Sequence, residues 1–197
     1  MSEKDAPISA ENKAIARHVA KAFGGPPRVH EYADRPERLT VGILYSRDRP
    51  RAGVTSYSTI RLSDHPMPWG DGEFPTRLEL AGVCVNEAEF FPNILASAAF
   101  SIMKSDAVYH PGTVMPDAVR QSYPASKLPH LYLTSPFLWE PELQTLDCGT
   151  KKVSWLLAMP ISESEYSYLR THDEKALEHL LESAKIDVAD LDRASLL

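Results

Sequence analysis

Apolar residues recur along the first part of the chain with the spacing of one helical face. In "SAENKAIARHVAKAF", residues 9–23, they gather on one side, and Ser9 is placed to cap the first turn. The stretch Gly24-Gly25-Pro26-Pro27 follows. It is typical of a helix end, because glycine adopts the left-handed cap and proline cannot continue the helix. The pattern predicts a helix over residues 9–23.

Strand-like patterns follow this helix. β-branched and aromatic residues, in places alternating with polar ones, predict strands over residues 28–34, 38–46, 54–62 and 76–85. Prolines and glycines predict a loop at 63–75, between the last two strands. Further on, residues 130–137 contain a short strand. Residues 145–161 read as a hairpin that ends in a buried strand with a continuous apolar run.

The best helical pattern of the chain lies at residues 86–105. Asn86 and Glu89 have the spacing of a capping box, which would start the helix at residue 86. Pro92 lies inside the pattern, so the helix either begins near this proline or bends there. From about residue 105 to residue 150 the chain is rich in prolines and predicts mostly loops.

Two further helices are predicted near the C-terminus, over residues 162–170 and 173–184. Ser162 and Glu165 form a second capping-box pattern at the start of the first of them. The order along the chain is helix, strands, helix, hairpin, helices. This order predicts an α+β fold, in which a mixed β-sheet packs against helices.

Length and composition fit one folded domain. We expect the 197 residues to comprise an N-terminal helix and linker over 1–28 and a core over 29–197. Apolar residues make up 43% of the chain and charged residues 24%, which favours a packed core over disorder. The net charge of −6 argues against sequence-independent binding to nucleic acid, which needs a basic face, and favours a neutral or basic partner.

The sequence contains no pattern of export or membrane insertion. Its N-terminus is polar and acidic, unlike a signal peptide, and its longest apolar runs are too short to cross a bilayer. We therefore expect a cytoplasmic protein without membrane contact. Two isolated cysteines, Cys84 and Cys148, are more often reduced thiols in such a chain. A disulfide between them stays open, because the sequence does not place them near each other.

The stretch "GVTSYSTIRLSDHP", residues 53–66, contains the residue types of a nucleophilic triad. Ser63, Asp64 and His65 are consecutive, however, so their side chains point in different directions and cannot form a relay. We interpret the stretch as a strand that ends at Leu62, with Ser63 or Asp64 capping the turn that follows.

Other catalytic patterns are weak. The histidines and cysteines have no metal-ligand spacing, and the chain has no phosphate-binding glycine motif, so no metal and no cofactor is predicted. Acidic residues gather between 71 and 89, among them Glu79. Two of them could form a catalytic pair, but an exposed strand face and an acidic first helical turn are the more common origin of such clusters. We expect no enzyme, and keep an enzyme with a dispersed site as an alternative.

Aromatic residues in the proline-rich loops point to binding. They share a loop-like setting near acidic residues and are Trp69, Phe74, Tyr109, Tyr123, Phe137 and Trp139. Aromatic side chains in such positions often anchor protein interfaces.

Several segments, in their order and spacing, resemble suppressor-of-fused domains. "VTSYSTIRLSDHP" followed by "EFPTRLEL" is similar to a T-x-G-x-S-D-like strand end before an E-L-x-x-R-L-like strand, although the glycine is absent from Thr59-Ile60-Arg61. "AFSIMKSDAVYHPGTVMP" resembles the long helix and the P-G-x-x-x-P loop of that family. Residues 126–181 resemble its strand, hairpin and P-I-x-x-x-E helix. The resemblance runs from about residue 35 to the C-terminus.

This resemblance implies a single α/β sandwich-like domain without established enzymatic activity. In animals, a two-domain relative clamps a transcription-factor peptide as an added strand. Bacterial one-domain members are associated with toxin systems, and many look like immunity proteins. The resemblance therefore predicts a protein that binds and neutralises a cognate toxin, with a nuclease as one kind of target. A general protein or peptide interaction module is the alternative.

The predicted contact residues for a protein partner come from the loops discussed above. They are Asp64, His65, Trp69, Asp71, Glu73, Trp139 and Glu140.

Overall fold

The computed structural model describes residues 8–34, 36, 38–86 and 88–197. The four α-helices of this part are α1 (Ala10–Phe23), α2 (Phe91–Met103), α3 (Glu163–Thr171) and α4 (Glu174–Ser183). The strands are β1 (Arg28–Asp34), β2 (Leu39–Arg47), β3 (Val54–Ile60), β4 (Pro68–Trp69), β5 (Gly72–Glu73), β6 (Thr76–Val85), β7 (Val114–Met115), β8 (His130–Thr134), β9 (Leu146–Asp147) and β10 (Lys152–Ile161). Two short 3₁₀ turns, η2 (Leu62–Asp64) and η3 (Phe137–Trp139), complete the set.

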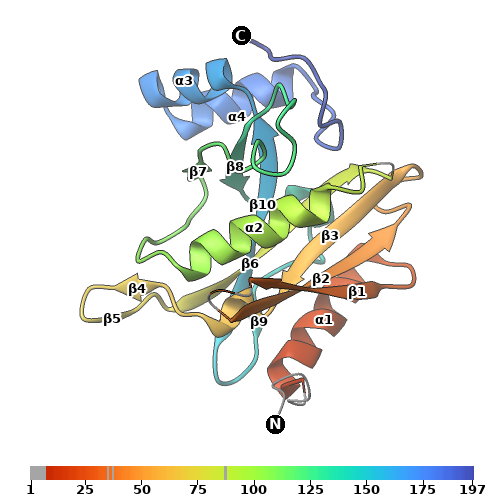
Figure 1. The fold of residues 1–197 in the computed structure, drawn as a ribbon, viewed down its shortest axis with the longest axis vertical. Coiled ribbons are helices and arrows are strands. Elements are labelled where there is room, and N and C mark those ends of the chain that lie inside the picture. The colour runs from red at the N-terminus through yellow and green to blue at the C-terminus, as the bar shows by residue number, and fades with distance from the viewer. Residues whose placement is uncertain (1–7, 35, 37, 87) are drawn as a thin grey trace.

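A mixed sheet organises the molecule (Figure 1). Its strand order is β1-β2-β3-β6-β10-β8-β7, and β9 pairs beside the start of β10. The β6–β10 pair is parallel, and the other neighbours are antiparallel. A two-stranded ribbon, β4–β5, projects away from this sheet. The prediction of an α+β domain with a mixed sheet is confirmed.

Helices cover both faces of the sheet. Helix α2 buries Phe91, Ile94, Leu95 and further residues against one face, which includes Leu80 and Leu156. On the opposite face, α1 and α4 pack over a second apolar cluster. Because the central strands are covered on both sides, β3 is buried along its whole length.

Polar side chains of β3 are accommodated by specific hydrogen bonds. The indole N–H groups of Trp139 and Trp155 donate to the hydroxyls of Ser56 and Ser58, each at 3.1 Å. The hydroxyl of Thr55 donates to Asn86 at 2.6 Å. Buried hydroxyls without partners would destabilise the core, so these bonds explain how a polar strand occupies the middle of the sheet.

Local capping signals were correct at two helices and wrong at a third. Ser9 caps α1, and the Ser162–Glu165 capping box starts α3 as predicted. The Asn86–Glu89 box is not used, because α2 begins only at Phe91. The alternative that the helix begins near Pro92 is confirmed, and this proline lies in the first turn. Instead, the side chain of Asn86 bonds to Asp48 and Thr55.

Within the described ranges, no helix combines the length and the apolar character that crossing a bilayer requires. Cys84 is buried and Cys148 is partly buried.

Candidate functional site

The residues that resembled a triad do not form one. Lys151 donates its ammonium to Asp64 Oδ1 at 2.7 Å and to the Ser63 carbonyl at 3.0 Å. The Asn12 amide of α1 donates to Asp64 Oδ2 at 2.9 Å. Among the described contacts, none joins His65 to Ser63 or Asp64 by a hydrogen bond. The Asp64 carboxylate therefore ties the turn to α1 and Lys151 and does not orient an imidazole.

The charges around this turn agree with a structural role. Burial favours the neutral form of Asp64, but the bonds from Lys151 and Asn12 outweigh it and lower the pKa of the carboxyl. Partial burial lowers the pKa of His65, and the nearby cations Arg61, Arg77 and Lys151 add to this effect against the attraction of Asp64. His65 is thus held toward its neutral form.

Glu79, and not Ser63 or Asp64, shapes the turn after β3. Its Oε1 accepts hydrogen bonds from the backbone amides of Arg61 and Ser63, each at 3.1 Å, and Thr59 donates to its Oε2 at 2.5 Å. The sequence placed Glu79 among exposed strand charges. In the structure it is fully buried, and burial raises the pKa of its carboxyl despite these bonds. Strand β3 ends at Ile60, two residues earlier than predicted, because the hydrogen bonds from these amides to Glu79 favour the turn that begins η2.

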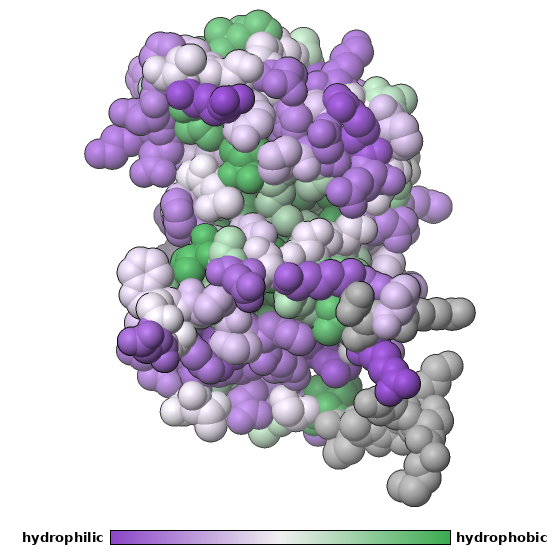
Figure 2. Space-filling view, turned by 60° about the vertical axis from the view of Figure 1, so that its left-hand side comes forward, coloured by the Kyte–Doolittle hydropathy of each residue, from purple (hydrophilic) through white to green (hydrophobic). Residues whose placement is uncertain are grey.

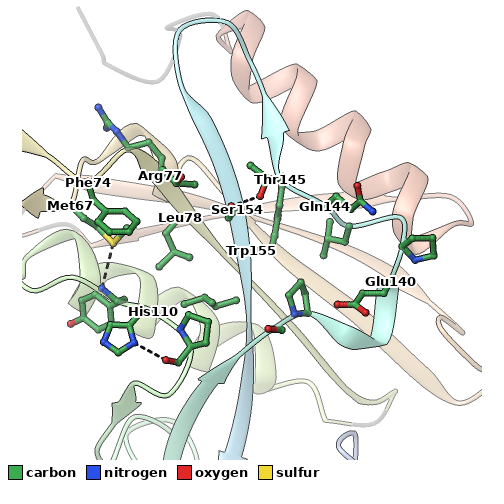
Figure 3. A pocket seen from close by; sticks show the side chains of 18 residues that line it. Met67, Phe74, Arg77, Leu78, His110, Glu140, Gln144, Thr145, Ser154 and Trp155 are labelled. Carbon is green, nitrogen blue, oxygen red and sulfur yellow. Dashed lines mark hydrogen bonds between the residues drawn. The ribbon is translucent and has the colours of Figure 1, made fainter. Parts of the chain in front are cut away.

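A large cleft lies on the α2 face of the sheet, next to the loop that follows α2. Its volume is about 690 Å³, and β6, β10, the loop after α2 and the segment after β8 all contribute to it. Leu78 lies near its centre, between Met67 and Phe74 on one side and Ser154 on the other (Figure 3). Its charged lining residues are Arg77 and Glu140. On the face that Figure 2 shows, hydrophobic atoms are recessed between hydrophilic ridges.

One side of the cleft is an interruption in the sheet. Strand β8 pairs with β10 only from Leu157 onward, and β9 pairs with it only at Lys152 and Val153. Residues 154–156 of β10 therefore have a strand partner on the β6 side alone in the described register. Between β9 and β8 the chain leaves the sheet through η3, and the side chains of Thr145 and Ser154 bond to each other at 2.6 Å across the space left. Backbone groups exposed at a sheet edge can pair with an incoming extended segment.

The structure brings some of the predicted contact residues to this cleft and not others. Glu140 lines it directly. Trp69 is 61% exposed and its ring meets Phe74 edge-to-face, with centroids 5.7 Å apart. Glu73 is joined to the cleft through a 2.6 Å ion pair with Arg77.

The remaining predicted residues lie elsewhere. Asp71 is exposed at the tip of the β4–β5 ribbon, and Asp64 and His65 belong to the turn beside α1. Trp139 is only 3% exposed, because its ring packs on Phe23 in the core. The proline-rich sequence around Trp139 predicted an exposed loop and gave no sign of this burial. Trp139 is therefore not part of the candidate surface. The sequence missed Leu78, Ser154 and Leu156, which looked like ordinary strand residues.

The arrangement is suited to binding and not to an obvious reaction. In the described part of the chain, no group of three or more His, Cys, Asp or Glu side chains could hold a metal ion. The cleft offers an apolar floor, one cation, one carboxylate and His110, whose Nδ1 lies 2.6 Å from the carbonyl of Pro111. A concave apolar floor with a few polar groups at its rim is typical of recognition sites.

Comparison with known proteins agrees with this picture. The family model "Suppressor of fused protein (SUFU)" matches residues 37–194. The chain is 36% identical to Immunity protein YqcF of Bacillus subtilis (strain 168) over 189 residues, covering 96% of this chain and 98% of that protein.

Solved structures share the fold. A putative SUFU homolog from Neisseria gonorrhoeae FA 1090 has a TM-score of 0.74 at 19% identity, covering 94% of this chain and 96% of the other. A chain of the Sufu–Fu complex has a TM-score of 0.67 at 14% identity, with 93% and 91% covered. Drosophila Suppressor of Fused has a TM-score of 0.66 at 14% identity, and 93% of this chain matches 50% of that longer chain. The chain belongs to the suppressor of fused protein family.

Proposed function

We propose that the chain is an immunity protein, which binds a cognate bacterial toxin and neutralises it without catalysing a reaction. The observation that carries this proposal is the 36% identity to Immunity protein YqcF along nearly the whole of both chains. The cleft supports it, because its lining offers apolar contact surface and no converging catalytic groups.

The charge of the chain supports a basic toxin, such as a nuclease. Toxins that bind nucleic acid need positive surface, and a partner with a net charge of −6 would be steered toward them by long-range attraction. Neutralisation would then follow from covering the basic surface of the toxin.

The surface that we propose for the toxin runs from the β4–β5 ribbon across the cleft. Trp69 supplies an exposed aromatic anchor at one end, and Glu140 supplies a carboxylate at the other. Between them, residues 154–156 of β10 have a strand partner on one side only, and a short extended segment of the toxin would pair with their other side.

Co-expression with a toxin encoded beside the gene for this chain tests the proposal. The toxin alone should arrest growth of a bacterial host. The toxin together with this chain should permit growth, and the two proteins should purify as a complex. Growth arrest in both cases, with no complex recovered, would overturn the proposal.

The gap in strand pairing along β10 also favours a second function, a module that binds extended peptides from proteins other than toxins. A binding partner without toxicity, which competes with the toxin or replaces it, would support this alternative.

A further inference from the structure

A second cavity lies on the opposite face of the sheet, between α4 and the end of β8. Its volume is about 520 Å³. Its apolar lining comes from elements far apart in the sequence and consists of Phe137, Met159, Leu181, Ile186 and Val188. Phe137 is 48% exposed, so its ring is available at the rim. The cavity shares Ser135 with the cleft described above, and the two hollows therefore flank the same segment after β8.

The negative charge of the chain is concentrated in its C-terminal part, which contributes α4 and the following loop to this cavity. Residues 162–197 hold nine acidic and four basic residues, a net charge of −5, whereas the whole chain carries −6. The remainder of the chain is thus close to neutral. Several acids of the β3–β6 region are also matched by cations, since Asp64 pairs with Lys151 and Glu73 with Arg77. The excess of negative charge therefore lies with α3, α4 and the C-terminal segment, which form the upper part of Figure 1.

Within the cavity, one carboxylate is held in place and remains available. Glu178 Oε1 accepts hydrogen bonds from the hydroxyls of Tyr132 at 3.0 Å and Thr134 at 2.6 Å. Both bonds go to the same oxygen, and no hydrogen bond from the described residues reaches Oε2. Glu182, one turn further along α4, adds a second carboxylate to the lining, and Lys185 adds one ammonium group. The lining therefore carries a net negative charge beside an apolar floor.

We propose that this cavity receives an arginine side chain of the basic protein partner, an inference that rests on the proposed function. The methylene stem would pack on Met159, Leu181 and Val188, and the guanidinium would reach Glu178 Oε2. The half-exposed ring of Phe137 fits a stacked guanidinium. An acidic and apolar cavity of this kind selects a long cationic side chain, because an acidic residue would be repelled and a short apolar one would leave the carboxylates unpaired.

A titration with a small probe tests the cavity without the partner. Nα-acetyl-arginine methylamide is added to the ¹⁵N-labelled full chain, and backbone amide shifts are followed by NMR. The citrulline analogue, which has the same shape without the charge, serves as the matched ligand. Saturable shifts at Thr134, Glu178 and Leu181 are expected with arginine, and binding of citrulline should be at least about ten-fold weaker. Equal shifts with both probes, or shifts confined to other surfaces, would overturn the proposal.

The variant Glu178→Gln isolates the charge. Its amide oxygen can still accept from Tyr132 and Thr134, so the fold should survive, while the arginine probe should lose about ten-fold or more in affinity. Asp106→Asn, which removes an exposed carboxylate from the loop after α2, is the matched control and should bind the probe like the parent chain. Undiminished binding by Glu178→Gln contradicts the proposal.

The same variants in the toxin assay separate this inference from the proposed function. If the parent chain neutralises the toxin and Glu178→Gln does so with unchanged affinity, the arginine site is wrong and the immunity function stands. If the parent chain does not neutralise the toxin, the proposed function fails, and the probe titration still decides whether the cavity binds arginine.

Discussion

The carboxylate of Glu79 holds the backbone of Arg61 in a left-handed conformation. Arg61 has φ 87° and ψ −8°, and its amide donates to Glu79 Oε1 at 3.1 Å. In the T-x-G-x-S-D-like pattern that residues 59–64 resemble, Arg61 takes the place of the glycine. Glycine is the residue that adopts positive φ without steric cost. The glutamate therefore stabilises a turn that the local sequence disfavours, and this turn leads into the ribbon beside the cleft.

Removing the acceptors of Glu79 should destabilise the fold more than removing its charge. Glu79→Ala leaves two buried amides and the Thr59 hydroxyl without partners and should cost about 3 kcal/mol or more in the free energy of unfolding. Glu79→Gln can still accept from both amides through its oxygen and should cost much less. Urea denaturation of the two variants measures the difference, and similar losses in both would contradict this account.

The pH dependence of Glu79→Gln gives a second test. Because burial raises the pKa of Glu79 in the folded state, the ionised form weakens the fold as pH rises through the usual carboxyl range and beyond. Glutamine does not titrate. The stability of Glu79→Gln relative to the parent should therefore improve from acidic to neutral pH, whereas a constant difference would show that Glu79 keeps an ordinary pKa.

Arg61→Gly should stabilise the protein. Glycine relieves the left-handed strain, and the ion pairs that are lost, to Glu31 at 3.6 Å and Asp64 at 3.9 Å, are long and exposed. We expect a gain of about 1 kcal/mol in the free energy of unfolding. Arg61→Ala removes the same ion pairs but keeps the strain, so it should show no gain. Thermal denaturation measures the stability of both variants. An equal stability of Arg61→Gly and Arg61→Ala would contradict the role of backbone strain.

The C-terminal segment should detach in acid. Arg193 forms a buried pair with Glu165, with bonds of 2.7 and 2.9 Å. Burial opposes ionisation of Glu165, but Arg193 and the backbone amides of Ser162 and Leu196 outweigh it and lower its pKa. This contribution to stability is present above the usual carboxyl pKa and is lost as pH falls through the lowered value.

Arg193→Ala leaves the buried charge of Glu165 unpaired and should cost about 3–5 kcal/mol in the free energy of unfolding at neutral pH, measured by urea denaturation. A loss below about 1 kcal/mol would contradict the assignment of this pair as a buried anchor.

Trp69→Ala should weaken partner binding without affecting the fold. The ring is 61% exposed and meets Phe74 edge-to-face, so we expect an unchanged melting temperature and about ten-fold weaker toxin binding. Val29→Ala is the matched control, since Val29 is 55% exposed on the edge strand β1. If both variants bind the toxin like the parent, the cleft is not the contact surface.

Local features of this fold could be predicted from the sequence, and long-range ones could not. Ser9 and the Ser162–Glu165 pair cap helices through contacts three residues apart, which a short pattern records. The bonds from Trp139 to Ser56 and from Trp155 to Ser58 join residues 83 and 97 positions apart, and no pattern along the chain records them.

The candidate site also depends on contacts between distant parts of the chain, which local sequence patterns do not record. Trp139 looked like an exposed loop aromatic, because nothing nearby in the sequence indicates that η3 folds back over Phe23. Likewise, the gap beside the cleft exists because β8 pairs with β10 only from Leu157 onward and β9 pairs with it only at Lys152 and Val153. The sequence does not record this register. The apolar cavity beside α4 also combines residues of α4 with residues of β8, β10 and two loops far away in the chain.

Calorimetric titration of the purified chain with its co-encoded toxin tests the central claim most directly. We expect a one-to-one complex with a dissociation constant of about 10 nM or tighter, as is usual for inhibitory protein pairs, together with loss of toxin activity at one equivalent. Absence of binding at micromolar concentrations, with toxin activity unchanged, would contradict the assignment of this chain as an immunity protein.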